Sequence, residues 1–145
     1  MRTETAREQL LLLDTHTWIW LVNGDEPLKS SPALPHIESA ARQSHLRVSA
    51  ISVWEVGMLE AKGRISLFLD CYDWVERALS APGLGLVRID PDVAVSSSRL
   101  PGSLHGDPAD RIIAATARKM DAVLVTRDRQ LIDYGSQGCV RVLPV

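Results

Sequence analysis

The sequence predicts a single α/β domain of three layers, in which helices cover both faces of a central, mainly parallel sheet of about five strands. Three observations indicate this fold class. The chain has 145 residues, which is enough for one hydrophobic core. Short aliphatic segments alternate with helical segments along its whole length. The aliphatic segments are apolar at successive positions, as is typical of strands covered on both faces.

The first half of the chain begins with a strand of four leucines over residues 10–13. Asp14 ends this strand, and a short helix is predicted over residues 15–22. Residues 23–35 are rich in Pro, Ser and Gly and predict a loop. Pro35, the last of them, lies near the first turn of a helix expected over residues 36–44.

A second strand is expected over residues 46–49. The helix predicted over residues 51–62 has apolar side chains at every third or fourth position and a glycine after its last residue. Another helix is predicted over residues 68–80, where Pro82 and Gly83 prevent its continuation.

A third strand over residues 84–89 leads to Asp90, a good N-cap for a helix over residues 92–100. Residues 101–106 predict a loop, and an acidic N-cap followed by proline starts a strongly patterned helix over residues 108–119. The last expected elements are a strand, a short helix and a strand over residues 122–125, 128–134 and 140–143.

The composition excludes several classes of protein. With 46% hydrophobic and 23% charged residues, the chain is neither disordered nor fibrous, and its aliphatic runs are too short to cross a membrane. No signal peptide is predicted, and residues 1–9 are expected to form a flexible tail. Cys71 and Cys139 lie far apart without ligand spacing, which predicts a reducing, cytoplasmic location and no zinc site.

The net charge of −2 by itself argues against a nucleic-acid partner. If metal ions neutralised four of the carboxylates, however, the rest of the chain would carry a net charge of +2. The overall charge therefore does not decide whether the protein binds nucleic acid.

Acidic residues follow two of the predicted strands. Asp14 comes directly after the first strand, and Asp128 follows the strand of residues 122–125. If these strands are adjacent and parallel, the two carboxylates meet at one edge of the sheet, where ligands of such folds bind. Each aspartate is also a common turn former or N-cap.

Glu55 lies in the middle of a helix, close to its apolar face. Burial of an unpaired carboxylate is costly, so a partner is expected. The sequence leaves two interpretations of Glu55: a functional role, or a salt bridge at the edge of the core with Arg64 or Lys62.

Asp107 and Asp110 stand at the start of the helix of residues 108–119. Local helix chemistry is enough to explain both residues: Asp107 as the N-cap, and Asp110 as a first-turn acid that the helix dipole favours. Carboxylates converging on one cleft would nevertheless repel one another and require a cation. Oxygen ligands without His or Cys favour Mg²⁺ or Mn²⁺, and hydrolysis of a phosphodiester is the natural inference.

Four segments resemble the PIN-domain ribonucleases, specifically the VapC-type toxins of bacterial toxin–antitoxin systems. They are residues 12–16 (LLDTH), 52–55 (SVWE), 107–117 (DPADRIIAATA) and 125–128 (VTRD). No single block is decisive, but four blocks in the right order over residues 11–142 are quite specific.

This resemblance implies a three-layer PIN-like fold and endonucleolytic cleavage of RNA that depends on Mg²⁺ or Mn²⁺. It implies metal-binding roles for Asp14, Glu55 and Asp110, and an auxiliary catalytic role for Asp128. Further residues that match the family's pattern as auxiliary groups are Asp107, Thr15 and Thr126. The resemblance also implies a homodimer inhibited by a cognate antitoxin, whose tail would cover the acidic cleft.

Contacts with the RNA backbone are expected from arginines near the site, with helix-end salt bridges as the alternative. The candidates are Arg111, Arg127 and Arg129. Trp18 and Trp20 are candidates for stacking on a base, although core or dimer packing explains them more readily.

Other classes of function fit the residues less well. A haloacid-dehalogenase-like phosphatase needs Asp-x-Asp, and position 16 is His. A receiver-type phosphoacceptor domain needs a lysine after a late strand, where this chain has none. A non-catalytic module that binds a protein or nucleic acid remains open.

Overall fold

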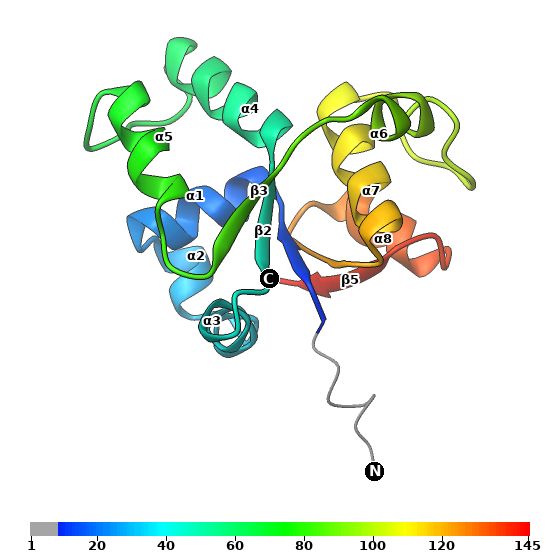
Figure 1. Cartoon of the computed structure of the whole chain (residues 1–145), viewed down its shortest axis with the longest axis horizontal. Helices are drawn as coiled ribbons and strands as arrows, with labels where there is room; N and C mark the ends of the chain where they lie inside the picture. Colours follow the sequence, from blue (N-terminus) through cyan, green and yellow to red (C-terminus); the bar gives the residue numbers. More distant parts are fainter. Residues whose placement is uncertain (1–8) are drawn as a thin grey trace.

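The central sheet of the computed structural model has five strands in the order β3-β2-β1-β4-β5 (Figure 1). The structure describes residues 9–145. The strands are β1 (Leu11–Leu13), β2 (Leu46–Ser49), β3 (Leu84–Val87), β4 (Val123–Thr126) and β5 (Arg141–Pro144). All neighbouring strands pair in parallel, so the sheet is entirely rather than mainly parallel.

Strand β1 is central because it pairs with both β2 and β4. Leu13, its last residue, lies opposite Val48 on one side and Val125 on the other. The carboxyl ends of β1 and β4 are therefore adjacent, which brings Asp14 and Asp128 to the same edge of the sheet. The sheet thus brings together Asp14 and Asp128, which are 114 positions apart in the sequence.

 

The leucines of β1 point alternately into two cores on opposite faces of the sheet. Leu11 and Leu13 belong to one hydrophobic core, and Leu12 belongs to the other. Leu12 and Leu13 are fully buried and Leu11 nearly so. The continuous apolarity of this segment is thus explained, because each face of the strand is covered by helices.

The helices divide between the two faces. They are α1 (Thr15–Asn23), α2 (Glu26–Lys29), α3 (Leu34–Arg42), α4 (Ala50–Ala61), α5 (Cys71–Leu79), α6 (Pro91–Ser96), α7 (Pro108–Met120) and α8 (Arg129–Ser136). Helices α1 to α5 contribute to the core that holds Leu13, where Trp18 and Trp74 meet edge to face with their ring centroids 5.2 Å apart. Helices α7 and α8 contribute to the core around Leu12, and α6 lies beside α7 (Figure 1). The three-layer α/β/α prediction is therefore confirmed.

Several predicted boundaries are wrong. The loop predicted over residues 23–35 contains α2 and the start of α3. A helix of four residues is a single turn, too short to show a periodic pattern, and the proline in the first turn of each helix starts the helix rather than breaking it.

The helix predicted over residues 68–80 begins only at Cys71, because Asp70 is its N-cap. Helix α6 ends at Ser96 instead of residue 100, and β3 ends at Val87 instead of residue 89. The remaining elements begin and end within two residues of the predicted positions.

Two predictions concern the N-terminus and the membrane. Of the tail expected over residues 1–9, only Gln9 lies among the described residues, and it accepts a hydrogen bond from Arg141. Within residues 9–145, no helix is long and apolar enough to span a membrane.

Candidate active site

Three aspartates of the site are N-caps. The Asp14 carboxylate accepts from the backbone N–H of His16, and the Asp107 carboxylate accepts from that of Asp110. Asp128 caps α8 by accepting from the N–H groups of Gln130 and Leu131. In each case one carboxylate oxygen makes the capping bonds. The second oxygen remains for other partners, so capping and a functional role are compatible.

The five acidic residues singled out in the sequence line one cavity of about 370 Å³. They are Asp14, Glu55, Asp107, Asp110 and Asp128, and the cavity is also lined by His16, Trp20 and Arg127. Strand ends supply the first and last of these acids, α4 supplies Glu55, and the start of α7 supplies the other two. The convergence expected at the carboxyl edge of the sheet is therefore present.

Two threonine hydroxyls orient the carboxylates of Asp14 and Glu55. Thr126 Oγ1 donates to Asp14 Oδ2 and also accepts from the backbone N–H of Asp128, at 2.9 Å. Thr15 Oγ1 donates to Glu55 Oε1. Both threonines are buried, so these contacts hold the carboxylates in fixed orientations.

Ser52, which no sequence motif singled out, extends this arrangement. Its hydroxyl lies 2.8 Å from that of Thr15, and its side chain is fully buried. The available signal was its position one helical turn before Glu55, on the same side of α4. Among the described residues, Glu55 forms no salt bridge with Arg64 or Lys62, so the boundary-pair interpretation is wrong.

Burial and mutual repulsion raise the pKa values of three of these carboxyl groups. Burial raises the pKa of Asp14, and burial followed by the charges of Asp14 and Asp107 raises the pKa of Glu55. The pKa of Asp110 rises to about 8, because the group is desolvated and lies near Asp107, Asp128, Asp14 and Glu55. A divalent cation among these groups would remove the repulsion. Oxygen donors of this kind fit such an ion.

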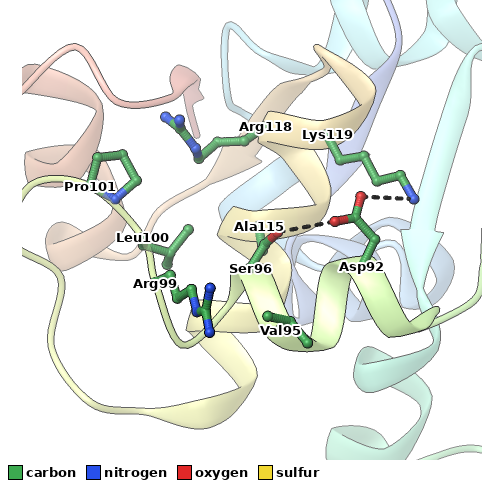
Figure 2. A pocket seen from close by; sticks show the side chains of 9 residues that line it. All are labelled: Asp92, Val95, Ser96, Arg99, Leu100, Pro101, Ala115, Arg118 and Lys119. Carbon is green, nitrogen blue, oxygen red and sulfur yellow. Dashed lines mark hydrogen bonds and ion pairs between the residues drawn. The ribbon is translucent and has the colours of Figure 1, made fainter.

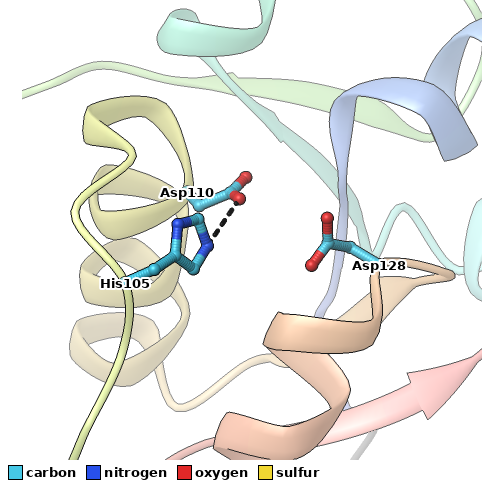
Figure 3. A group of neighbouring side chains, drawn as sticks. All are labelled: His105, Asp110 and Asp128. Carbon is cyan, nitrogen blue, oxygen red and sulfur yellow. Dashed lines mark ion pairs between the residues drawn. The ribbon is translucent and has the colours of Figure 1, made fainter.

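A histidine that the sequence did not single out lies beside the acids. His105 Nε2 lies 3.1 Å from Asp110 Oδ2. Together with Asp128, these residues place one nitrogen and two carboxylate oxygens within 4.8 Å of one another. Figure 3 shows the three side chains. The sequence offered one signal, the position of His105 two residues before the cap of α7.

The hydrogen bonding of the imidazole indicates its role. His105 Nδ1 accepts from the backbone N–H of Asp107 at 3.3 Å. In a neutral imidazole the proton then lies on Nε2, the nitrogen that faces Asp110. A protonated nitrogen has no free lone pair for a metal ion. The geometry therefore favours His105 as a group that orients Asp110, and leaves the carboxylates as the candidate ligands.

The three candidate arginines have different surroundings. Arg127 lines the acidic cavity, and Arg129 is exposed at the start of α8. Arg111 donates to the backbone carbonyls of Ser97 and Leu104, both at 2.8 Å, and to that of His105. Its guanidinium thus connects the loop before α7 to the helix. The sequence did not suggest this structural role, which differs from both an RNA contact and a salt bridge.

A second cavity, of about 470 Å³, lies between α6 and α7 (Figure 2). Lys119, at its rim, pairs with Asp90 at 2.6 Å and with Asp92 at 3.3 Å. Arg118 donates to the backbone carbonyl of Cys139. Of the three basic residues that line this cavity, Lys119 and Arg118 thus already have polar partners.

Fold and site together define the class: a three-layer α/β protein with carboxylates gathered at the carboxyl edge of a parallel sheet. Residues 11–136 match the family model described as the PIN domain. The chain belongs to the PIN-domain family, which confirms the resemblance read from its four sequence blocks.

The comparisons also identify individual relatives. The chain is 37% identical over 121 residues to Ribonuclease VapC22 of Mycobacterium tuberculosis, a match that covers 83% of this chain and 88% of the relative. Among solved structures, VapBC2 from Rickettsia felis bound to a promoter DNA fragment matches with a TM-score of 0.67 at 16% identity, covering 93% of this chain and 98% of the other. A toxin–antitoxin complex from Klebsiella pneumoniae matches with a TM-score of 0.53 at 24% identity, covering 83% and 89%.

Proposed function

We propose that this protein is a metal-dependent endoribonuclease and the toxin of a toxin–antitoxin pair. The observation that carries the proposal is the meeting of five carboxylates in one cavity of a PIN-domain chain. The 37% identity to Ribonuclease VapC22 supports RNA as the substrate. The raised pKa of Asp110, caused by burial and by neighbouring acids, supports a site that requires a cation to keep these groups ionised.

We assign different roles to the carboxylates of the cavity. Asp14, Glu55 and Asp110 would hold Mg²⁺ or Mn²⁺, the hard divalent ions that oxygen ligands favour. When bound, such an ion would polarise the scissile phosphate and lower the pKa of the attacking water. Asp128, an exposed residue that lines the cavity, would orient that water or contribute to a second ion.

The remaining groups position the reactants. Thr15 and Thr126 keep Glu55 and Asp14 in fixed orientations through their hydroxyls. Arg127, at the cavity wall, would contact a phosphate of the RNA backbone. In-line attack by water would leave a 5′ phosphate and a 3′ hydroxyl on the products. Asp107 would act mainly through α7, whose first turn it caps beside Asp110.

The partners and the location follow from the same proposal. A cognate antitoxin would inhibit the enzyme by covering the acidic cavity, in line with the toxin–antitoxin complex among the similar structures. A homodimer of single-domain chains in the cytoplasm, where the RNA is found, completes the proposal. The two free cysteines, Cys71 and Cys139, are compatible with this reducing compartment.

The test is cleavage of total cellular RNA by the purified chain, with new 5′ ends mapped. Cleavage should require Mg²⁺ or Mn²⁺ and stop when EDTA is added. Asp14→Asn should abolish it, whereas Asp133→Asn, on the exposed side of α8, should leave it unchanged. Equal cleavage by the wild type and Asp14→Asn would remove the catalytic assignment. Binding of RNA without any cleavage would instead favour a non-catalytic module.

A further inference from the structure

The acidic cavity contains an aromatic pair that the hydrolysis itself does not use. Trp20 and His16 line the cavity together with the carboxylates. They stand four residues apart on α1, so their side chains lie on the same side of the helix. Their ring centroids are 6.0 Å apart and the rings are tilted by 49°.

The charge of the cavity makes a neutral contact useful. Five carboxylates line it, and Arg127 is the one arginine or lysine among the described lining residues. An RNA chain carries a negative charge at each phosphate, and bound divalent ions would neutralise these acids only where the reacting phosphate lies. A neighbouring nucleotide therefore gains most from a contact that does not depend on charge. Stacking of a base on an aromatic ring is such a contact.

Trp20 is built to offer a ring in a fixed position. Its indole is partly exposed and packs along one side against the hydrophobic core below α1, while the exposed His16 lies against it. Trp18, two residues earlier, is fully buried against Trp74 and does not line the acidic cavity. An indole held in this way loses little conformational entropy when a base binds.

We propose that Trp20, supported by His16, is a stacking platform for an unpaired base of the RNA, next to the nucleotide whose phosphate meets the carboxylates. This inference rests on the proposed function and adds a substrate-positioning residue to it. A base within a duplex has both faces covered by its neighbours, so only a single-stranded or splayed-out base can stack on Trp20. Trp20 therefore positions an unpaired base beside the carboxylates.

The test is a binding cycle in the Asp14→Asn chain, so that RNA is bound but not cut. Affinities of a 12-nucleotide oligoadenylate RNA and of an abasic 12-mer with the same backbone are measured by fluorescence anisotropy in the presence of Mn²⁺. Trp20→Ala should weaken binding of oligoadenylate by about 5- to 150-fold, the range expected for one stacked base. It should change binding of the abasic strand less than 2-fold, within the roughly 0.4 kcal/mol that such a ratio represents.

Three control variants and a measurement of stability separate stacking from structure. Trp20→Phe should retain most of the affinity, because a phenyl ring also stacks. Trp54→Ala should have no effect, because Trp54 is 54% exposed beside Glu55 but does not line the cavity. Thermal unfolding of each variant establishes that the fold is retained, and Trp20→Leu, which keeps apolar packing but cannot stack, should weaken binding as Trp20→Ala does.

The outcomes that overturn the inference are specific. Equal loss of affinity for oligoadenylate and for the abasic strand would make Trp20 a packing residue. The inference would also be overturned if the Asp14→Asn chain bound a 12-base-pair RNA duplex as tightly as it binds the single-stranded oligoadenylate, or if it bound no RNA at all. Cleavage by the wild-type chain is measured separately. If Trp20→Ala weakens binding of oligoadenylate alone but the wild type cleaves no RNA, the proposed function is wrong and the stacking role of Trp20 is still supported.

Discussion

Replacing Asp110 by asparagine should stabilise the protein when no metal is present. The carboxyl group of Asp110 lies near four other acids, and burial together with their charges raises its pKa to about 8. Above that pH the folded protein must hold an additional, poorly solvated negative charge. Asparagine keeps the shape of the side chain and removes the charge.

The size of the effect follows from the shift in pKa. At about 1.36 kcal/mol per pH unit, a rise from 3.8 to about 8 corresponds to about 6 kcal/mol of destabilisation at high pH. Solvent reaches 16% of the side chain and screens part of the repulsion, so we expect about 1–3 kcal/mol in the variant. For a chain of this length that is roughly 3–9 °C in Tm.

The pH dependence has a definite sign. The folded state retains a proton on Asp110 that the unfolded chain releases near pH 4, so the free energy of unfolding of the metal-free wild type falls between about pH 4 and pH 8. Above about pH 8 this contribution stays constant. The advantage of Asp110→Asn should therefore be small near pH 5 and largest above pH 8.

The assay is thermal unfolding followed by circular dichroism in EDTA, from pH 5 to pH 9, with Asp133→Asn as the exposed control. Adding Mn²⁺ should reverse the order, because the wild type binds the ion more tightly and is stabilised by it. If Asp110→Asn is no more stable than the wild type at pH 8.5 in EDTA, the carboxylates do not repel one another as we infer.

Three further predictions concern the groups around the acids and the core. Thr126→Val should weaken Mn²⁺ binding by about 10-fold in calorimetry, because the hydroxyl that orients Asp14 is lost, while Thr126→Ser should retain the affinity. His105→Gln should also weaken Mn²⁺ binding by about 10-fold, and electron spin echo spectra of the wild-type complex should show no directly bonded nitrogen; a nitrogen coupling would make His105 a ligand. Leu12→Ala should lower the free energy of unfolding by about 2–5 kcal/mol in urea titrations, because Leu12 is fully buried, and a loss below 1 kcal/mol would contradict its place in the core.

Some elements could be predicted because their signals are local. The strand β2 has the predicted bounds, and α7 begins at the predicted Pro108, because an N-cap and a proline mark that position in neighbouring residues. The short helix α2 was missed, since a single turn stabilised by its surroundings leaves no repeating pattern.

The candidate site shows the same division. Asp14 and Asp128 could be singled out because each follows an apolar strand, and Glu55 because it interrupts an apolar helix face. Ser52 could not be assigned a partner, because its neighbour Thr15 comes from another helix, 37 residues earlier. The same applies to His105, whose position depends on the loop that Arg111 ties to α7.

The sequence by itself determined the fold class, most of the strands and helices, and the acidic residues from which a metal site can be built. Only the tertiary structure decided that β1 lies between β2 and β4, that Thr126 reaches Asp14 across 112 residues, and that Trp20 faces the cavity while Trp18 does not. The physical reason is the range of the interactions. Caps and periodic apolar faces depend on residues a few positions apart, whereas strand order and the contents of a cavity depend on packing between segments that are distant in the chain.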